Sequence, residues 1–341
     1  MDVNILDTIP HDVYREIAVF PQATIYHTKE WHQFLTTTFG WKVRAVCASQ
    51  SGKLVFFLPF ITKYRLDLKK HHICLPFCHS GIGPVYAEDF DLDTFFQDVF
   101  PLPQIEIHQS VEGAGLYQTI PNTIVFLHLH SFKNLEHVFH HFHEASIQRK
   151  IKKAQRHGVL VKQGWSAHDF ALFAEMAFET SRKHGSPSYP QTFFTNLHAC
   201  FQQTDALKLY VAYYENKPVA GVIFLHDQNV AIYAYGASLN NPDYFRLGVN
   251  QIVMWEAIKD AWEQQRDTVD FGTTPVSFEK LLHYKLKWGG QAYPLPYTYL
   301  HKTTGPLDRD RKSIQLASKI LQTIPAYWVK RFSPSLLKWV I

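Results

Sequence analysis

The feature that most constrains the fold is a helix–strand–turn–strand pattern that occurs twice, once in each half of the chain. Each copy places four apolar residues at helical spacing before a strand, a tight turn and a second apolar strand. In the first copy the helical residues are Trp31, Phe34, Leu35 and Phe39, followed by a strand at 43–46, a turn at 50–53 and a strand at 54–61. In the second copy they are Phe193, Phe194, Leu197 and Phe201, followed by a strand at 207–211, a turn at 215–218 and a strand at 219–225. A repeat of this length predicts two related half-domains, joined near residues 131–165.

Length and composition agree with two packed domains. The chain has 341 residues, and a hydrophobic content of 46% is enough for buried cores. A formal net charge of +4 argues against a protein built to coat nucleic acid. The four cysteines (Cys47, Cys74, Cys78 and Cys200) follow no zinc or disulfide spacing, which indicates a reducing compartment. With no signal-peptide pattern and no apolar run of roughly 20 residues, we expect a cytoplasmic protein.

The order of elements in the second half predicts an α+β fold. Residues 229–238 alternate as a strand, residues 248–265 carry an apolar helical stripe, and residues 268–272 resemble a further strand. Three strands in succession before one helix differ from the strict alternation of a doubly wound sheet.

Two segments between the halves carry unusual side chains. Residues 144–158 form a basic helix in which Arg149, Lys152 and Lys153 would either bind a phosphate or simply face solvent. Before it stand His137, His140, His141 and His143, a set that lacks the carboxylate pair or cysteine needed to complete a metal site. We therefore expect a histidine-rich surface helix and no bound metal.

Three further segments are candidate binding groups. Asp270-Phe271-Gly272 resembles a kinase motif, but the chain lacks the glycine-rich and His-Arg-Asp loops that a kinase needs. Residues 246–250, with Arg246 and Asn250, open a helix whose free N–H groups could bind a phosphate. The loop at 179–190 carries His184 and Tyr189; it is either a binding loop or a plain connector.

Four segments in this order resemble the Fem-type transferases, specifically the FemAB-related branch of the GNAT superfamily. They are Arg149-Lys-Ile-Lys-Lys-Ala-Gln-Arg-His-Gly158, Arg182-Lys-His-Gly-Ser-Pro-Ser-Tyr-Pro190, Val269-Asp-Phe-Gly272 and Tyr284-Lys-Leu-Lys-Trp-Gly289. Leu75-Pro-Phe-Cys78 with Gly81 and Gly83 looks like the family's apolar glycine loop. The resemblance covers roughly residues 20–300.

The resemblance implies tandem GNAT-like domains at 1–140 and 141–300 and transfer of an acyl or aminoacyl group to an amine of a cell-envelope precursor. That precursor would be nucleotide- or lipid-linked and belong to peptidoglycan or exopolysaccharide. The donor would be acyl-CoA or aminoacyl-tRNA, and no bound cofactor is expected. Two alternatives remain: an acyl-CoA-dependent N-acetyltransferase with a small or sugar acceptor, and a non-catalytic accessory protein of polysaccharide export.

The same resemblance suggests roles for individual residues. Lys285 matches the lysine of the family's aromatic–Lys–x–x–aromatic–Gly pattern, so we expect it to stabilise an oxyanion or bind a substrate phosphate. Asp270 would orient Lys285 or accept a proton from the amine. Lys287 alternates with Lys285 on one face of an expected strand, and Tyr235 and His184 are expected to line the cleft.

The C-terminal segment, 301–341, is expected to be a linker followed by an amphipathic helix. Residues 301–312 are polar, and aromatic and basic residues are interleaved beyond Pro325. Such a helix would either bind peripherally to a membrane surface, here the inner membrane, or dock on the body of the protein.

Overall fold

The computed structural model describes residues 1–64, 70–112, 115–300 and 319–340, which fall into two compact units. Unit 1 comprises Met1–Thr123 and the strand residues from Pro294 to Leu300, and unit 2 comprises Ile124–Tyr293 and the C-terminal helix. The boundary therefore lies earlier than the expected division at 140/141. The expected linker, 301–312, lies outside the described residues.

The strands and helices of unit 1 follow the predicted order of the first repeat. They are β1 (Asp2–Leu6), α1 (His11–Ile17), α2 (Lys29–Phe39), β2 (Arg44–Gln50), β3 (Lys53–Tyr64), β4 (Lys70–Cys74), β5 (Val85–Tyr86), α3 (Leu92–Thr94), a π-helical turn (Phe95–Val99) and β6 (Ile105–Ile107). Strands β1 to β4 are antiparallel neighbours, β6 is parallel to β4, and β13 (Gln291–Leu300) runs antiparallel beside β6.

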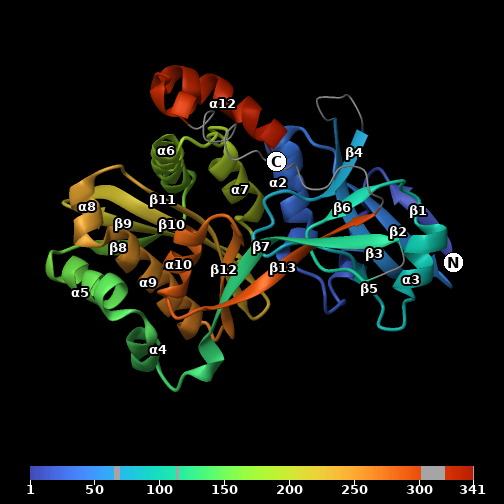
Figure 1. The fold of residues 1–341 in the computed structure, drawn as a ribbon, viewed down its shortest axis with the longest axis horizontal. Coiled ribbons are helices and arrows are strands. Elements are labelled where there is room, and N and C mark those ends of the chain that lie inside the picture. Colours follow the sequence, from blue (N-terminus) through green and yellow to red (C-terminus); the bar gives the residue numbers. More distant parts are fainter. Residues whose placement is uncertain (65–69, 113–114, 301–318, 341) are drawn as a thin grey trace. The chain divides into compact units, whose positions relative to one another are not determined.

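Unit 2 has the same strand plan (Figure 1). Its elements are α4 (Leu135–His141), α5 (Arg149–Arg156), β8 (Leu160–Gly164), α6 (Ala167–His184), α7 (Phe193–Phe201), β9 (Leu207–Tyr214), β10 (Lys217–Asp227), β11 (Val230–Ser238), α8 (Pro242–Leu247), α9 (Val249–Glu263), β12 (Thr268–Pro275), α10 (Glu279–Leu286) and α12 (Ala326–Val340). Strands β8 to β11 are antiparallel, β12 is parallel to β11, and β7 (Leu116–His128) lies beside β12.

The two copies share even their hairpin turns. The β2–β3 turn holds Ser51 and Gly52 at φ of 51° and 78°, and the β9–β10 turn holds Glu215 and Asn216 at φ of 49° and 62°. Two successive residues with positive φ characterise the type I′ turn, whose twist suits an antiparallel hairpin. The predicted duplication and the α+β class are thus confirmed in local geometry as well as in strand order.

The sheet of unit 2 is covered on both faces. On one face, α6 packs so closely that a Cβ at Gly221 of β10 would lie 2.8 Å from the Phe173 ring. On the other face, alternate residues of β10 share one apolar core with α9 and the buried face of α5. The predicted helical stripe of α9 and the predicted apolar face of the basic helix are confirmed, since Ala257, Ile258 and Ile151 are fully buried.

One prediction of secondary structure is wrong. The segment around Lys285 and Lys287 was expected to be a strand, but Glu279–Leu286 is helix α10 and β13 begins only at Gln291. Leu282 and Leu286 both pack against the core and stand four residues apart, which is helical rather than strand spacing. Lys285 and Lys287 therefore do not share a strand face.

Candidate functional site

The candidate site of unit 2 lies where strands β11 and β12 separate. These parallel strands pair only from Val230 to Ile232 and from Thr268 to Asp270, although β11 continues to Ser238 and β12 to Pro275. Backbone groups beyond the last pair need other partners, because unpaired buried amides and carbonyls are destabilising. The separation also leaves room between the strands and the start of α9.

Asp270 and Lys285 supply those partners. Asp270 Oδ1 accepts a 2.7 Å hydrogen bond from the N–H of Gly272, whose φ of 72° suits glycine. Lys285 Nζ donates to the carbonyl oxygens of Gly272 and Thr273 at 2.8 and 2.9 Å. The kinase-like Asp-Phe-Gly motif is thus a strand kink, and the Lys285 amine satisfies the carbonyls that the kink exposes.

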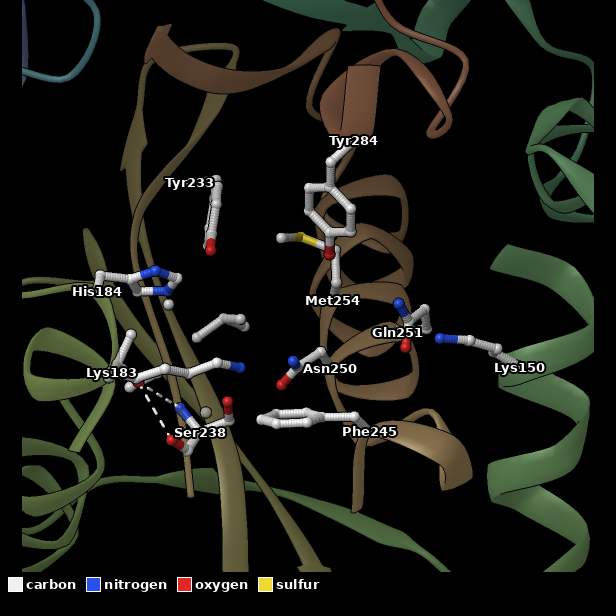
Figure 2. A pocket seen from close by; sticks show the side chains of 15 residues that line it. Lys150, Lys183, His184, Tyr233, Ser238, Phe245, Asn250, Gln251, Met254 and Tyr284 are labelled. Atoms are coloured by element: carbon white, nitrogen blue, oxygen red, sulfur yellow. Dashed lines mark hydrogen bonds between the residues drawn. The ribbon is translucent and has the colours of Figure 1, made fainter. Parts of the chain in front are cut away.

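A cavity of about 310 Å³ opens beside this separation (Figure 2). It is lined by the C-terminal end of α6, by β10 and β11, by α8 and the start of α9, and by one residue each from α5 and α10. Figure 2 shows His184, Lys183 and Tyr233 on one side and Asn250, Met254 and Tyr284 on the other.

One end of the cavity is positively charged. Lys183 extends across it, with its amine 3.9 Å from the centre of the Phe245 ring, and Lys150 reaches it from α5 beside Gln251. Helix α9 begins here at Gly248, whose φ is 89° and which provides no side-chain cap. A Cβ at Gly248 would lie 2.6 Å from the Lys150 carbonyl oxygen, so only glycine fits this crossing. Two lysines and an uncapped helix N-terminus together form a site suited to a phosphate group.

The other end of the cavity carries neutral polar groups. Burial, followed by the nearby charge of Lys183, lowers the pKa of His184, so its imidazole is neutral at pH 7. Burial also raises the pKa of Tyr233 and of Tyr284, so both hydroxyls remain protonated donors, and Figure 2 shows them pointing into the cavity. Gly236 faces the Tyr233 hydroxyl so closely that any Cβ there would overlap with it.

A second, smaller cavity of about 190 Å³ adjoins the first. Both are lined by Thr180 and Gly236. Tyr189 and Tyr235, two predicted binding residues, line only the smaller one, with ring centroids 5.7 Å apart.

The predicted site residues separate into four groups. His184 and Asn250 line the larger cavity, Tyr189 and Tyr235 line the smaller one, and Asp270 and Lys285 form the kink behind them without lining either. The other five line neither cavity. Arg149 pairs with Glu144, Lys152 lies over Phe139 and Arg246 pairs with Asp243. Lys287 is exposed and Lys153 is half-buried.

Several lining residues were missed from the sequence. Lys150 stands among the basic residues that were chosen, but it alone of that helix lines the cavity. Lys183 and Tyr284 lie inside quoted motifs without having been singled out, and Tyr233 and Gln251 gave no signal beyond ordinary amphipathic spacing. A helical wheel of residues 149–156 places Lys150 on a different face from Arg149 and Lys152. It does not show which of these faces meets α9.

The predicted absence of a histidine metal site remains a prediction about the whole chain. Within the described residues, no group of three or more metal-ligating side chains comes together. His137, His140, His141 and His143 are exposed, and His141 Nε2 lies 3.1 Å from the Gly289 carbonyl oxygen.

Comparisons with known proteins agree with the strand plan. The family model for the acetyltransferase (GNAT) domain matches residues 142–286, which include both cavities and the kink. A curated relative from Weissella viridescens, a UDP-N-acetylmuramoylpentapeptide-lysine N(6)-alanyltransferase, is 26% identical over 196 residues. The match spans 56% of this chain and 57% of that relative.

Solved structures support the fold. A crystal structure of FemX has a TM-score of 0.66 at 13% identity and covers 93% of this chain and 100% of its own. A tandem GNAT protein from the clavulanic acid biosynthesis pathway has a TM-score of 0.51 at 7% identity, covering 89% and 100%. At these identities the likeness concerns the fold alone, which is tandem and GNAT-like as expected.

Proposed function

Because the chain belongs to the FemAB-related branch of the GNAT proteins, we propose that it transfers an acyl or aminoacyl group to an amine of a cell-envelope precursor. The donor would occupy the larger cavity of unit 2. The relative named above acts on the lysine of a nucleotide-linked muramoyl pentapeptide, so we propose a primary amine of a nucleotide- or lipid-linked precursor as acceptor.

The observation that carries this proposal is the polarity of the cavity. Both candidate donors, acyl-CoA and aminoacyl-tRNA, present phosphates at a distance from a reactive carbonyl. Lys150, Lys183 and the start of α9 suit the phosphates at one end. His184, Tyr233 and Tyr284 suit the carbonyl and the attacking amine at the other.

The transfer itself needs a neutral nucleophile and a stabilised oxyanion. The amine nitrogen of the acceptor attacks the donor carbonyl carbon, a C–N bond forms, and the C–O bond of an ester or the C–S bond of a thioester breaks. In the proposed mechanism, neutral His184 accepts the proton released by the amine and returns it to the leaving oxygen or sulfur. The protonated hydroxyl of Tyr233 or Tyr284 donates a hydrogen bond to the oxyanion.

Asp270 and Lys285 act differently in this proposal from the role inferred from the sequence. Both Lys285 carbonyl contacts lie within the protein, and neither residue lines a cavity. We therefore assign them as positioning residues that hold the strand kink open, so that the donor can enter between β11 and β12.

Binding experiments test the donor first. Thermal unfolding of the protein is followed with acetyl-CoA, with alanyl-tRNA and with UDP-N-acetylmuramoyl pentapeptide, since a ligand that binds only the folded state raises the transition temperature. We expect one donor to stabilise the protein and Lys150→Met and Lys183→Met each to weaken its binding roughly tenfold. The matched control is Lys217→Met, an exposed lysine in the β9–β10 turn.

A transfer assay then tests the chemistry. We expect His184→Gln to lower the rate on the order of 100-fold at pH 7 and to remove the acidic limb of the pH–rate profile. An unchanged rate and profile would show that His184 is not the base.

The same assay separates the alternative functions. Acetyl transfer to free glucosamine but not to the pentapeptide would favour a small or sugar acceptor. Tight binding of the precursor without any transfer would favour an accessory binding protein.

A further inference from the structure

Helix α12 is fixed to the body of unit 2 by one of its faces. Lys330 Nζ lies 2.7 Å from Glu175 Oε2 on α6 and 4.7 Å from the centre of the Phe178 ring. Val329 and Leu337 are buried, and just before the helix Gln322 donates a hydrogen bond to the Lys183 carbonyl oxygen. The expectation that this segment docks on the protein is therefore confirmed for this face.

The opposite face of α12 exposes large aromatic side chains. Tyr327, Trp328 and Phe332 are 68%, 49% and 55% exposed, and the rings of Trp328 and Phe332 stack 5.5 Å apart. Arg331 is also exposed, and helical spacing places it on the same side as Tyr327. We call Tyr327, Trp328, Arg331 and Phe332 the aromatic–basic face. Within the described residues, Arg331 forms no ion pair.

The C-terminal segment, residues 319–341, carries basic side chains without acidic ones. Residues 319–341 contain Lys319, Lys330, Arg331 and Lys338 but neither aspartate nor glutamate. The chain has 34 basic and 30 acidic residues, so its net charge of +4 equals that of this segment alone. The other 318 positions are balanced, with 30 residues of each sign.

From these observations we propose that the aromatic–basic face of α12 docks the protein on an anionic phospholipid surface. Tryptophan and tyrosine rings prefer the boundary between acyl chains and head groups. A basic residue beside such rings adds attraction to anionic lipids, worth roughly a fivefold gain in affinity for each charge near the surface. No helix within the described residues is long and apolar enough to cross a bilayer. The contact we propose is peripheral, through one face of a helix that lies on the surface.

Vesicle sedimentation tests the proposal with the full chain. The protein is mixed with vesicles of phosphatidylcholine alone or with added phosphatidylglycerol, at low and at high salt. We expect binding only to the anionic vesicles and its loss at high salt. Arg331→Glu should weaken binding roughly 25-fold, since one attractive charge is lost and one repulsive charge is added, at about fivefold each. The double variant Trp328→Ser/Phe332→Ser should weaken it at least about tenfold through lost apolar contact.

Two controls match these variants. Trp165→Ser removes a tryptophan outside α12 that is 61% exposed, more than Trp328, and Lys217→Glu reverses an exposed charge in the β9–β10 turn. Both should bind vesicles like the unmodified protein, and all variants should keep its unfolding midpoint. Lack of binding to anionic vesicles, or equal loss in variants and controls, would overturn the proposal. So would a dimer in solution that the double variant disrupts, because the face would then serve a second copy of the chain. Since the assay contains neither donor nor acceptor, its failure would leave the proposed transferase activity untouched.

Discussion

The hydrogen bonds of Lys285 make a prediction that can be worked out from the structure. The variant is Lys285→Met, which preserves most of the side-chain volume but removes the amine. Lys285 is 5% exposed, and its amine donates to two carbonyl oxygens of β12, at 2.8 and 2.9 Å. Burial lowers the pKa of Lys285 from 10.5 to about 8, and the nearby Asp270 carboxylate only partly opposes this shift.

At pH 10.5 and above, the amine is largely neutral in the folded chain and becomes neutral in the unfolded chain. The neutral amine still donates both hydrogen bonds, so the variant leaves two buried carbonyls without a donor. Each unsatisfied carbonyl reduces the free energy of unfolding by about 1–3 kcal/mol. We therefore expect Lys285→Met to be less stable than the unmodified protein by roughly 2–6 kcal/mol at this pH.

At pH 7 the same substitution has a smaller effect. Between pH 8 and pH 10.5 the unfolded chain retains a proton that the folded chain has released, so the free energy of unfolding rises with pH across this interval. A shift of about 2.5 pKa units corresponds to about 3 kcal/mol. Below pH 8 the unmodified protein has lost that contribution, and we expect the difference between the two proteins to shrink towards zero.

Urea unfolding at pH 7, 8, 9 and 10.5 measures the difference. The control is Lys287→Met, because Lys287 is exposed at the end of the same helix and its loss should change stability by less than about 0.5 kcal/mol. A stability difference for Lys285→Met that stays constant or falls with rising pH would refute the reasoning. A variant that is fully stable but inactive in transfer would instead restore the catalytic role that the sequence suggested.

Three further predictions concern other parts of the molecule. Gly236→Ala should force the Tyr233 ring into the larger cavity and weaken donor binding while the unfolding midpoint shifts little, which calorimetric titration and urea unfolding can separate. Burial lowers the pKa of His27 to about 4 and of His32 to about 3. Acidification from pH 6.5 to pH 4 should therefore reduce the free energy of unfolding by about 3 kcal/mol for each histidine. In urea unfolding across this pH range, the midpoint of His32→Gln should fall less steeply than that of the unmodified protein. Burial raises the pKa of Glu106, but hydrogen bonds from two histidines outweigh this effect and hold the pKa below 4.5. The unmodified protein should therefore have its full stability advantage over Glu106→Gln above pH 4.5, and this advantage should shrink below that pH.

Local periodicity allowed much of the fold to be predicted. The aromatic spacing of 31–39 and 193–201 appears as α2 and α7, with every spaced residue buried. The two hairpins were predicted because each turn is short and lies between apolar runs, and both close with positive φ. These signals lie within about ten residues of chain, the range over which helix and strand periods are distinct.

The candidate site could be predicted only in part, because its parts meet through packing. Lys150 and Asn250 are a hundred positions apart and line one cavity because α5 packs beside α9. The segment 284–289 was predicted as a strand from its alternating lysines, but Lys285 belongs to helix α10. Lys285 is buried because its amine bonds to carbonyls of β12 that have no partner in the neighbouring strand β11. Neither feature is encoded in a local pattern.

The duplicated plan also supports placing the proposed donor cavity in unit 2. Both units place a parallel strand after their antiparallel strands, β6 beside β4 and β12 beside β11. Between β4 and β6 the helical segments are short, the three residues of α3 and a π-helical turn, and the Asp91 carboxylate caps the start of α3. Before β12 the chain forms the 15 residues of α9, which starts at an uncapped glycine. A phosphate competes poorly with a carboxylate that already occupies a helix N-terminus, whereas an uncapped long helix leaves its first N–H groups for a ligand. Of the two copies of the strand plan described here, the helix geometry thus suits donor binding in the second.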